Sequence, residues 1–103
     1  MAQSLEYTTD AFLLHLQLER GLSAHTISNY ARDLARLAEF LEDRRCPLSL
    51  QREDIEAFVA WLRDTRELSA RSAARALSAV RTYCRFLVRE KIRPDDPSDL
   101  VPS

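Results

Sequence analysis

The order of apolar and polar residues along the chain predicts four amphipathic helices. Apolar positions recur at intervals of three and four residues, the spacing that places them on one face of a helix. The expected helices cover residues 9–20, 24–43, 52–66 and 70–91. The side chains expected to face inward are Phe12, Leu13, Leu16, Ile27, Tyr30, Leu34, Leu37, Ala38, Leu41, Ile55, Phe58, Val59, Leu62, Ala73, Leu77, Val80, Cys84 and Leu87.

The residues between these segments are typical of helix ends. Gly21 suits the left-handed conformation that often closes a helix, and it lets Leu22 fold back on Leu16. Ser69 suits the N-cap of the last helix. The 103 residues include a single glycine and almost no alternating β-branched pattern, which disfavours a sheet. We therefore predict an all-α fold with one domain.

Residues 94–103 differ from everything before them. They contain three prolines and three aspartates and show no apolar periodicity. Proline cannot continue a helix, and this composition is typical of an extended linker. We therefore expect residues 1–93 to form the folded domain and residues 94–103 to begin a linker that moves independently of it.

Positive charge is concentrated in one stretch of a chain whose net charge is only −1. Residues 69–93 carry seven basic side chains and one acid, Glu90. The basic residues are Arg71, Arg75, Arg81, Arg85, Arg89, Lys91 and Arg93. This asymmetry indicates where a polyanion would bind, although the overall pI hides it.

Part of this charge falls on a single helical face. Arg71, Arg75, Arg85 and Arg89, together with Ser78 and Thr82, share one face of the last helix over roughly 27 Å. Few acids stand four residues away to pair with them. A row of guanidinium groups matches a phosphate backbone or the edge of a groove. A solvated face is the alternative, and the scarcity of pairing acids weighs against it.

The segment 24–43 carries a second polar face, formed by His25, Asn29, Arg32 and Arg36. Asp33 and Glu39 lie near enough in sequence to pair with its arginines, so a solvated, salt-bridged face fits the pattern as well as a binding face does. Thr26 can present its hydroxyl and nearby N–H groups to a phosphate, or it can simply support the helix cap.

Several kinds of function lack support in the sequence. No apolar run approaches the ~20 residues that span a bilayer, and no signal-peptide pattern is present, which predicts a cytoplasmic protein that binds no membrane. Cys46 and Cys84 have no His or Cys at zinc-ligand spacing and are expected to be reduced, unpaired thiols. No nucleophile–base pair or glycine-rich phosphate loop occurs. We therefore expect no metal, no cofactor and no enzymatic activity from this chain alone.

Taken in order along the chain, many of these residues resemble a known domain. They are Phe12, Leu16, Glu19, Arg20, Gly21, Leu22, Ser23, Thr26, Tyr30, Asp33, Leu34, Phe40, Leu41, Asp54, Ile55, Leu68, Ser69, Arg75, Leu77, Ser78, Ala79, Val80, Arg81, Phe86, Leu87, Glu90, Asp96 and Pro97. Together they resemble the N-terminal core-binding domain of tyrosine recombinases, in particular Xer-type recombinases and phage integrases. The family usually has asparagine at the position of Asp96 and an aromatic residue at the position of His15.

The resemblance implies a SAM-like, orthogonal four-helix bundle that forms one half of a C-shaped clamp on duplex DNA, next to the crossover site. In that family the second and fourth helices face the major groove and the adjacent phosphates, which matches the two polar faces described above. The preferred contact positions are then Thr26, Arg32, Arg71, Arg75 and Ser78. The wider set of candidate DNA-binding residues adds His25, Asn29, Arg36, Arg81 and Arg85.

The resemblance also implies a longer parent protein. In the family, a linker and a catalytic domain follow, and the enzyme breaks and rejoins DNA through a phosphotyrosine link, as several subunits on DNA, without metal or nucleotide. The present chain is therefore expected to be an excised, monomeric domain cut within that linker, in preference to a truncated gene product. The target DNA stays open, as does the choice between a chromosome-resolving recombinase and a mobile-element integrase.

A rival hypothesis belongs to another class of function. A helical protein-interaction module would use the same basic helix to receive an acidic partner. Binding to duplex DNA that weakens steeply with salt, without binding to acidic peptides, distinguishes the two hypotheses.

Overall fold

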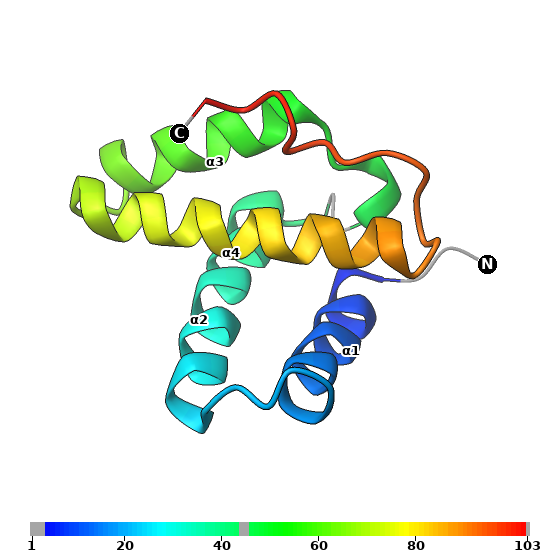
Figure 1. Cartoon of the computed structure of the whole chain (residues 1–103). Helices are drawn as coiled ribbons and strands as arrows, with labels where there is room; N and C mark the ends of the chain where they lie inside the picture. Colours follow the sequence, from blue (N-terminus) through cyan, green and yellow to red (C-terminus); the bar gives the residue numbers. More distant parts are fainter. Residues whose placement is uncertain (1–3, 44–45, 103) are drawn as a thin grey trace.

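The structure is a computed structural model that describes residues 4–43 and 46–102. Its elements are α1 (Leu5–Leu18), α2 (Ala24–Leu41), a short 3-10 helix η1 (Pro47–Ser49), α3 (Arg52–Asp64) and α4 (Ala70–Arg89). No strand occurs in these two ranges. In Figure 1, α3 lies beside α4, and α4 crosses the pair formed by α1 and α2 at a steep angle. The predicted all-α class, with one domain of four helices, is confirmed for this part of the chain.

The helix starts agree with the predicted ones except at α1, and each helix ends two residues earlier than predicted. Helix α1 begins four residues before the predicted start, because the Ser4 side chain accepts a hydrogen bond of 3.0 Å from the backbone N–H of Tyr7. The extra turn buries Leu5 and Thr8. The polar residues around Leu5 had concealed this turn in the apolar pattern.

The same turn ends α1 and α3. Gly21 adopts φ 60°, and the N–H of Leu22 donates to the carbonyl of Leu16 at 3.2 Å. Forty-six positions later, Glu67 adopts φ 55°, and the N–H of Leu68 donates to the carbonyl of Leu62 at 2.9 Å. The predicted left-handed position of Gly21 is confirmed. A serine then caps each following helix: Ser23 accepts from the N–H of Thr26 and Ser69 from that of Ser72, each at 3.1 Å.

These two turns predict opposite effects of exchanging the residue at the left-handed position. Gly21→Ala should lower the free energy of unfolding by roughly 1 kcal/mol, and Glu67→Gly should raise it by a similar amount, because only glycine enters this region without steric cost. A Cβ at Gly21 would meet no atom within 4 Å, so the cost there comes from the backbone alone. Urea denaturation measures both changes.

Glu67→Ala is the matched control, because it removes the carboxylate and leaves the backbone cost in place. We expect it to change stability little. If Glu67→Gly instead destabilises the domain, the left-handed conformation at this position is not a source of strain.

The core is centred on the ring of Phe12, which is fully buried. Its centroid lies 5.8 Å from that of Tyr30, 5.7 Å from that of Tyr83 and 5.4 Å from that of Phe86, joining α1 to α2 and α4. The hydroxyls of Tyr83 and Thr8 share a buried hydrogen bond of 2.7 Å. Burial raises the pKa of Tyr83 to about 12. Every side chain predicted to face inward is buried or half-buried.

The two cysteines occupy different environments. Both are free thiols, as predicted. Burial raises the pKa of Cys84 to about 12, which leaves it protonated and inert near neutral pH. Cys46 lies before η1, where the backbone N–H of Leu48 lowers its pKa. Within the described ranges, no helix combines the length and apolar character needed to cross a bilayer.

Residues 93–102 pack against the helices, and the independent motion expected of residues 94–103 stays a prediction. The Arg93 side chain donates from Nη1 to the carbonyls of Pro47 at 2.8 Å and Leu50 at 2.7 Å. Val101 is only 6% exposed and joins the core. Figure 1 shows the chain after α4 turning back to run along α3. The prolines do end the helix, but the turns that follow bring single side chains and carbonyls onto the domain, which no periodicity reveals.

Candidate nucleic-acid interface

The polar faces of α2 and α4 meet at one small cleft of about 160 Å³. Four of the predicted DNA-binding residues line it: Thr26 and Asn29 from α2, and Arg75 and Ser78 from α4. The cleft therefore presents two hydroxyls, an amide and a guanidinium group, from segments almost fifty residues apart. Hydroxyl and amide groups of this kind hydrogen-bond base edges, and arginine binds guanine or phosphate.

A buried carboxylate at this cleft ties the two helices together. Asp33 of α2 is 1% exposed. Its Oδ1 accepts a hydrogen bond of 3.1 Å from Nη1 of Arg36 and lies 3.9 Å from Nε of Arg32. Its Oδ2 lies 3.8 Å from Nε of Arg75 on α4. Asp33 thus holds three of the predicted DNA-binding arginines beside the cleft.

Asp33 supplies the acidic partner that Arg75 lacks within its own helix. The arginines of α4 were expected to have few pairing acids, because none stands at the right spacing in the same helix. That expectation fails for Arg75, whose partner comes from another helix. It holds for Arg71, which is exposed and has no ion pair within the described residues. Arg71 is therefore the least compensated charge near the start of α4.

Two arginines of the basic stretch serve the fold. Arg81 is half-buried and donates to the carbonyls of Ser98 and Val101, which fixes the chain after α4. Arg93 is 5% exposed and holds the segment before α3. The sequence places both in the positive stretch, but neither belongs to the open arginine row. Arg81, one of the ten predicted DNA-binding residues, is thus bound by carbonyl groups of the tail.

The remaining predicted residues lie at the edges of the α2–α4 face. His25 is exposed in the first turn of α2, where no hydrogen bond to its side chain is found within the described residues. Arg85 is exposed further along α4, and its Nη2 lies 3.4 Å from the hydroxyl of Thr82. Ser4, Asp33 and Arg93 were not predicted as organising residues. Only the serine cap has a local sequence signal.

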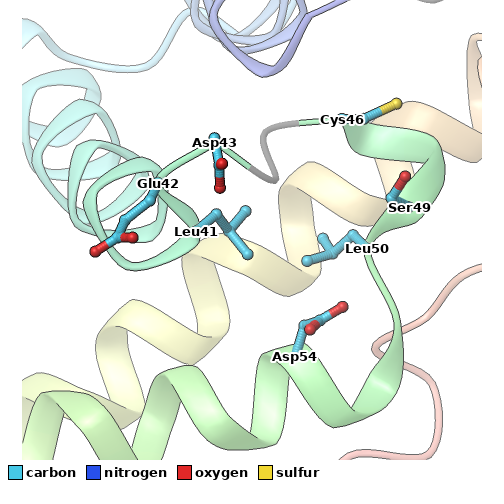
Figure 2. A pocket seen from close by; sticks show the side chains of 7 residues that line it. All are labelled: Leu41, Glu42, Asp43, Cys46, Ser49, Leu50 and Asp54. Atoms are coloured by element: carbon cyan, nitrogen blue, oxygen red, sulfur yellow. The ribbon is translucent and has the colours of Figure 1, made fainter.

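A larger pocket of about 510 Å³ lies between the end of α2 and the start of α3. Figure 2 shows the side chains of Glu42 and Cys46 on opposite sides of it, pointing away from each other. Asp54 is used to cap α3, because its carboxylate accepts a hydrogen bond of 2.9 Å from the N–H of Gln51. No cluster of three or more possible metal ligands is found in residues 4–43 and 46–102. The acidic side chains of this pocket therefore do not point toward one common position.

The family described as "Phage integrase, N-terminal SAM-like domain" matches residues 9–91. The match covers most of the chain, and the chain therefore belongs to this family, as the resemblance predicted. The N-terminal domain of a phage integrase/site-specific recombinase from Haloarcula marismortui shares the fold: the TM-score is 0.84 over 99% of each chain, at 18% sequence identity.

Curated relatives are tyrosine recombinases of the Xer type. The chain is 43% identical over 93 residues to tyrosine recombinase XerD of Proteus mirabilis, which covers 89% of this chain and 29% of that protein. It is 36% identical over 97 residues to XerD of Oceanobacillus iheyensis, covering 91% of this chain and 32% of that protein. XerC of Anoxybacillus flavithermus is 34% identical over 102 residues, or 96% and 33% of the two chains. The chain thus spans about a third of the length of these relatives.

Proposed function

We propose that this chain is the DNA-binding domain of a site-specific tyrosine recombinase and contacts duplex DNA through α2 and α4. The observation that carries the proposal is the convergence of Thr26, Asn29, Arg75 and Ser78 on one cleft. Arg71 extends the same face with an uncompensated charge. Membership of the integrase family and similarity to Xer recombinases support the same assignment.

The chemistry of the side chains supports a division of contacts. Asn29 and Ser78 sit inside the cleft, where an amide and a hydroxyl suit the donor and acceptor pattern of base edges. Arg71 is exposed at the N-terminal end of α4, where a guanidinium group suits a phosphate. Thr26 lies in the first turn of α2, and the N–H groups of that turn favour an anion. Phosphate contacts would set the position of the domain, and the cleft would face the bases.

The proposal extends to the longer protein that would contain this domain. Such a protein would be a tyrosine recombinase that breaks and rejoins DNA as an assembly of several subunits. This domain would anchor it beside the crossover site and would not itself perform the chemistry. The domain would leave the catalytic groups to the rest of the protein, and it would bind DNA without a cofactor.

Salt-dependent binding tests the proposal against an acidic protein partner. The isolated domain should bind mixed-sequence duplex DNA with a Kd near ~10⁻⁴ to 10⁻⁶ M at physiological salt, because it supplies few base contacts. Affinity should fall steeply as salt rises, since binding releases counterions from the phosphates. Fluorescence anisotropy with labelled duplex and labelled poly-glutamate measures both. Equal or tighter binding of the acidic peptide would favour the protein-interaction module instead.

A further inference from the structure

A second pocket with several arginines lies apart from the α2–α4 cleft, where the end of α1 meets the C-terminal half of α4. Its volume is about 300 Å³. It is lined by Phe12, His15, Arg20, Thr82, Arg85, Phe86 and Arg89. Three guanidinium groups and one hydroxyl therefore share a single cavity. Helix α1 did not figure in the predicted DNA-binding surface, and neither did Arg20.

The charges at this pocket are only partly balanced. Arg20 and Arg85 have no carboxylate partner within the described residues. Arg89 lies 3.8 Å from Oε2 of Glu19 and 3.5 Å from Oε2 of Glu90. The Glu19 side chain is 67% exposed and does not line the pocket. The pocket thus keeps two arginine charges available for an anion from outside.

His15 fixes the position of Arg89 at the pocket wall. Nδ1 of His15 lies 2.6 Å from Oε2 of Glu19, and Nη2 of Arg89 lies 2.9 Å from Nδ1 and 3.2 Å from Nε2 of the same ring. The guanidinium group of Arg89 therefore lies against the imidazole of His15, which in turn contacts Glu19. The hydrogen bond from His15 lowers the pKa of Glu19. Arg89 is therefore placed before any ligand arrives, which reduces the ordering cost of binding.

The floor of the pocket is aromatic. The ring centroids of Phe12 and Phe86 lie 5.4 Å apart, and those of His15 and Phe86 lie 5.3 Å apart. Phe12 is fully buried and Phe86 nearly so. Arg20, Arg85 and Arg89 are themselves exposed and stand around this aromatic floor.

We propose that this pocket binds one phosphate group of the DNA backbone, flanking the bases that the α2–α4 cleft faces. The inference rests on the proposed DNA-binding function. Arginine forks only donate hydrogen bonds, which suits a phosphodiester oxygen, whereas the Thr82 hydroxyl already donates to the carbonyl of Ser78 at 3.0 Å. Arg85 follows Arg75 by ten residues, or about 15 Å along α4. That spacing is close to the ~12 Å width of the major groove, so α4 can place its cleft over the groove and this pocket over one edge.

The number of phosphates bound gives a sharp test. Arg20→Ala combined with Arg85→Ala should reduce the slope of log affinity against log salt by about 0.9, the value for one lost phosphate contact. Affinity for duplex DNA at about 0.15 M salt should fall roughly 5-fold. Two separate phosphate contacts would reduce the slope by about 1.8 and would contradict a shared pocket. An unchanged slope would show that the pocket does not contact DNA.

The control variant is Arg52→Ala with Arg63→Ala on α3, which removes the same charge from exposed positions. It should leave the affinity for duplex DNA nearly unchanged. If it lowers the affinity as much as the pocket variant does, the effect comes from the change in net charge and not from the pocket. Arg71→Ala with Arg75→Ala is measured in parallel. If that variant weakens binding and the pocket variant does not, only the pocket fails. If neither variant changes binding, the proposed function fails with it.

A second variant separates a built pocket from general positive potential. Arg20→Lys with Arg85→Lys keeps both charges but loses the planar forks that hold two phosphate oxygens. Affinity at about 0.15 M salt should still fall several-fold, and the midpoint of thermal unfolding should not move, because both side chains are exposed. Wild-type affinity in the lysine variant would overturn the pocket as a phosphate site.

Discussion

Replacing Arg93 with alanine is expected to lower the free energy of unfolding by roughly 2–4 kcal/mol, because two carbonyls lose their buried donor. The Arg93 guanidinium donates to the carbonyls of Pro47 and Leu50 and is 5% exposed. It therefore joins the end of α4 to the segment that precedes α3. Urea denaturation followed by circular dichroism measures the change.

The matched control for this prediction is Asp95→Ala. Oδ1 of Asp95 forms an ion pair with Nη2 of the same guanidinium group at 3.2 Å, but the Asp95 side chain is 67% exposed. Exposed ion pairs contribute at most about 1 kcal/mol, so this variant should cost far less than Arg93→Ala. If both variants change stability by the same small amount, the segment after α4 is not fastened by the buried hydrogen bonds.

Replacing Arg71 and Arg75 together with alanine is expected to weaken duplex DNA binding between about 5-fold and 30-fold at about 0.15 M salt. The corresponding loss of salt slope is between about 0.9 and 1.8, for one or two phosphate contacts. The range has a structural reason. Arg71 has no ion pair within the described residues, whereas the Nε of Arg75 lies 3.8 Å from Asp33, which already balances part of its charge. Fluorescence anisotropy over a salt series measures both quantities.

The pair Arg52 and Arg63 provides the control here as well. Arg52 lies 3.5 Å from Glu53 and from Glu56, and both arginines belong to α3, away from the proposed face. Their double replacement should change affinity less than 2-fold, since neither would contact a phosphate. An equal loss of DNA affinity on replacing Arg52 and Arg63 would mean that the α2–α4 face is not the binding surface.

Much of the fold follows from local patterns in the sequence. The spacing of apolar residues predicts the helices and their buried faces, because periodicity reports directly on which side of a helix meets the core. Gly21 and Ser69 predict helix ends for similarly local reasons. The apolar pattern did not predict the first turn of α1, because Thr8 is polar. Its hydroxyl is nevertheless buried against that of Tyr83. A polar residue satisfied by a distant partner breaks the pattern without breaking the helix.

The organisation of the candidate site depends on contacts that no spacing records. Charge and periodicity predict the faces of α2 and α4, but the crossing of the helices decides that Asp33 meets Arg75. The same limit applies to Arg81 and Arg93. Their charges place them in the basic stretch, whereas carbonyl groups from segments far away in sequence or beyond α4 determine where their side chains bind. The number of basic residues in the stretch 69–93 therefore overstates how many positive charges are open to a ligand.

The proposed position of duplex DNA against the α2–α4 face can be read residue by residue in amide NMR spectra of the labelled domain. Adding a short mixed-sequence duplex should shift the signals around the α2–α4 cleft and Arg71, with smaller shifts beside Arg20 and Arg85. The signals of α3 residues such as Arg52 and Arg63 should stay in place. Shifts that cluster on α3, or an unchanged spectrum at low salt with excess duplex, would contradict the proposed position.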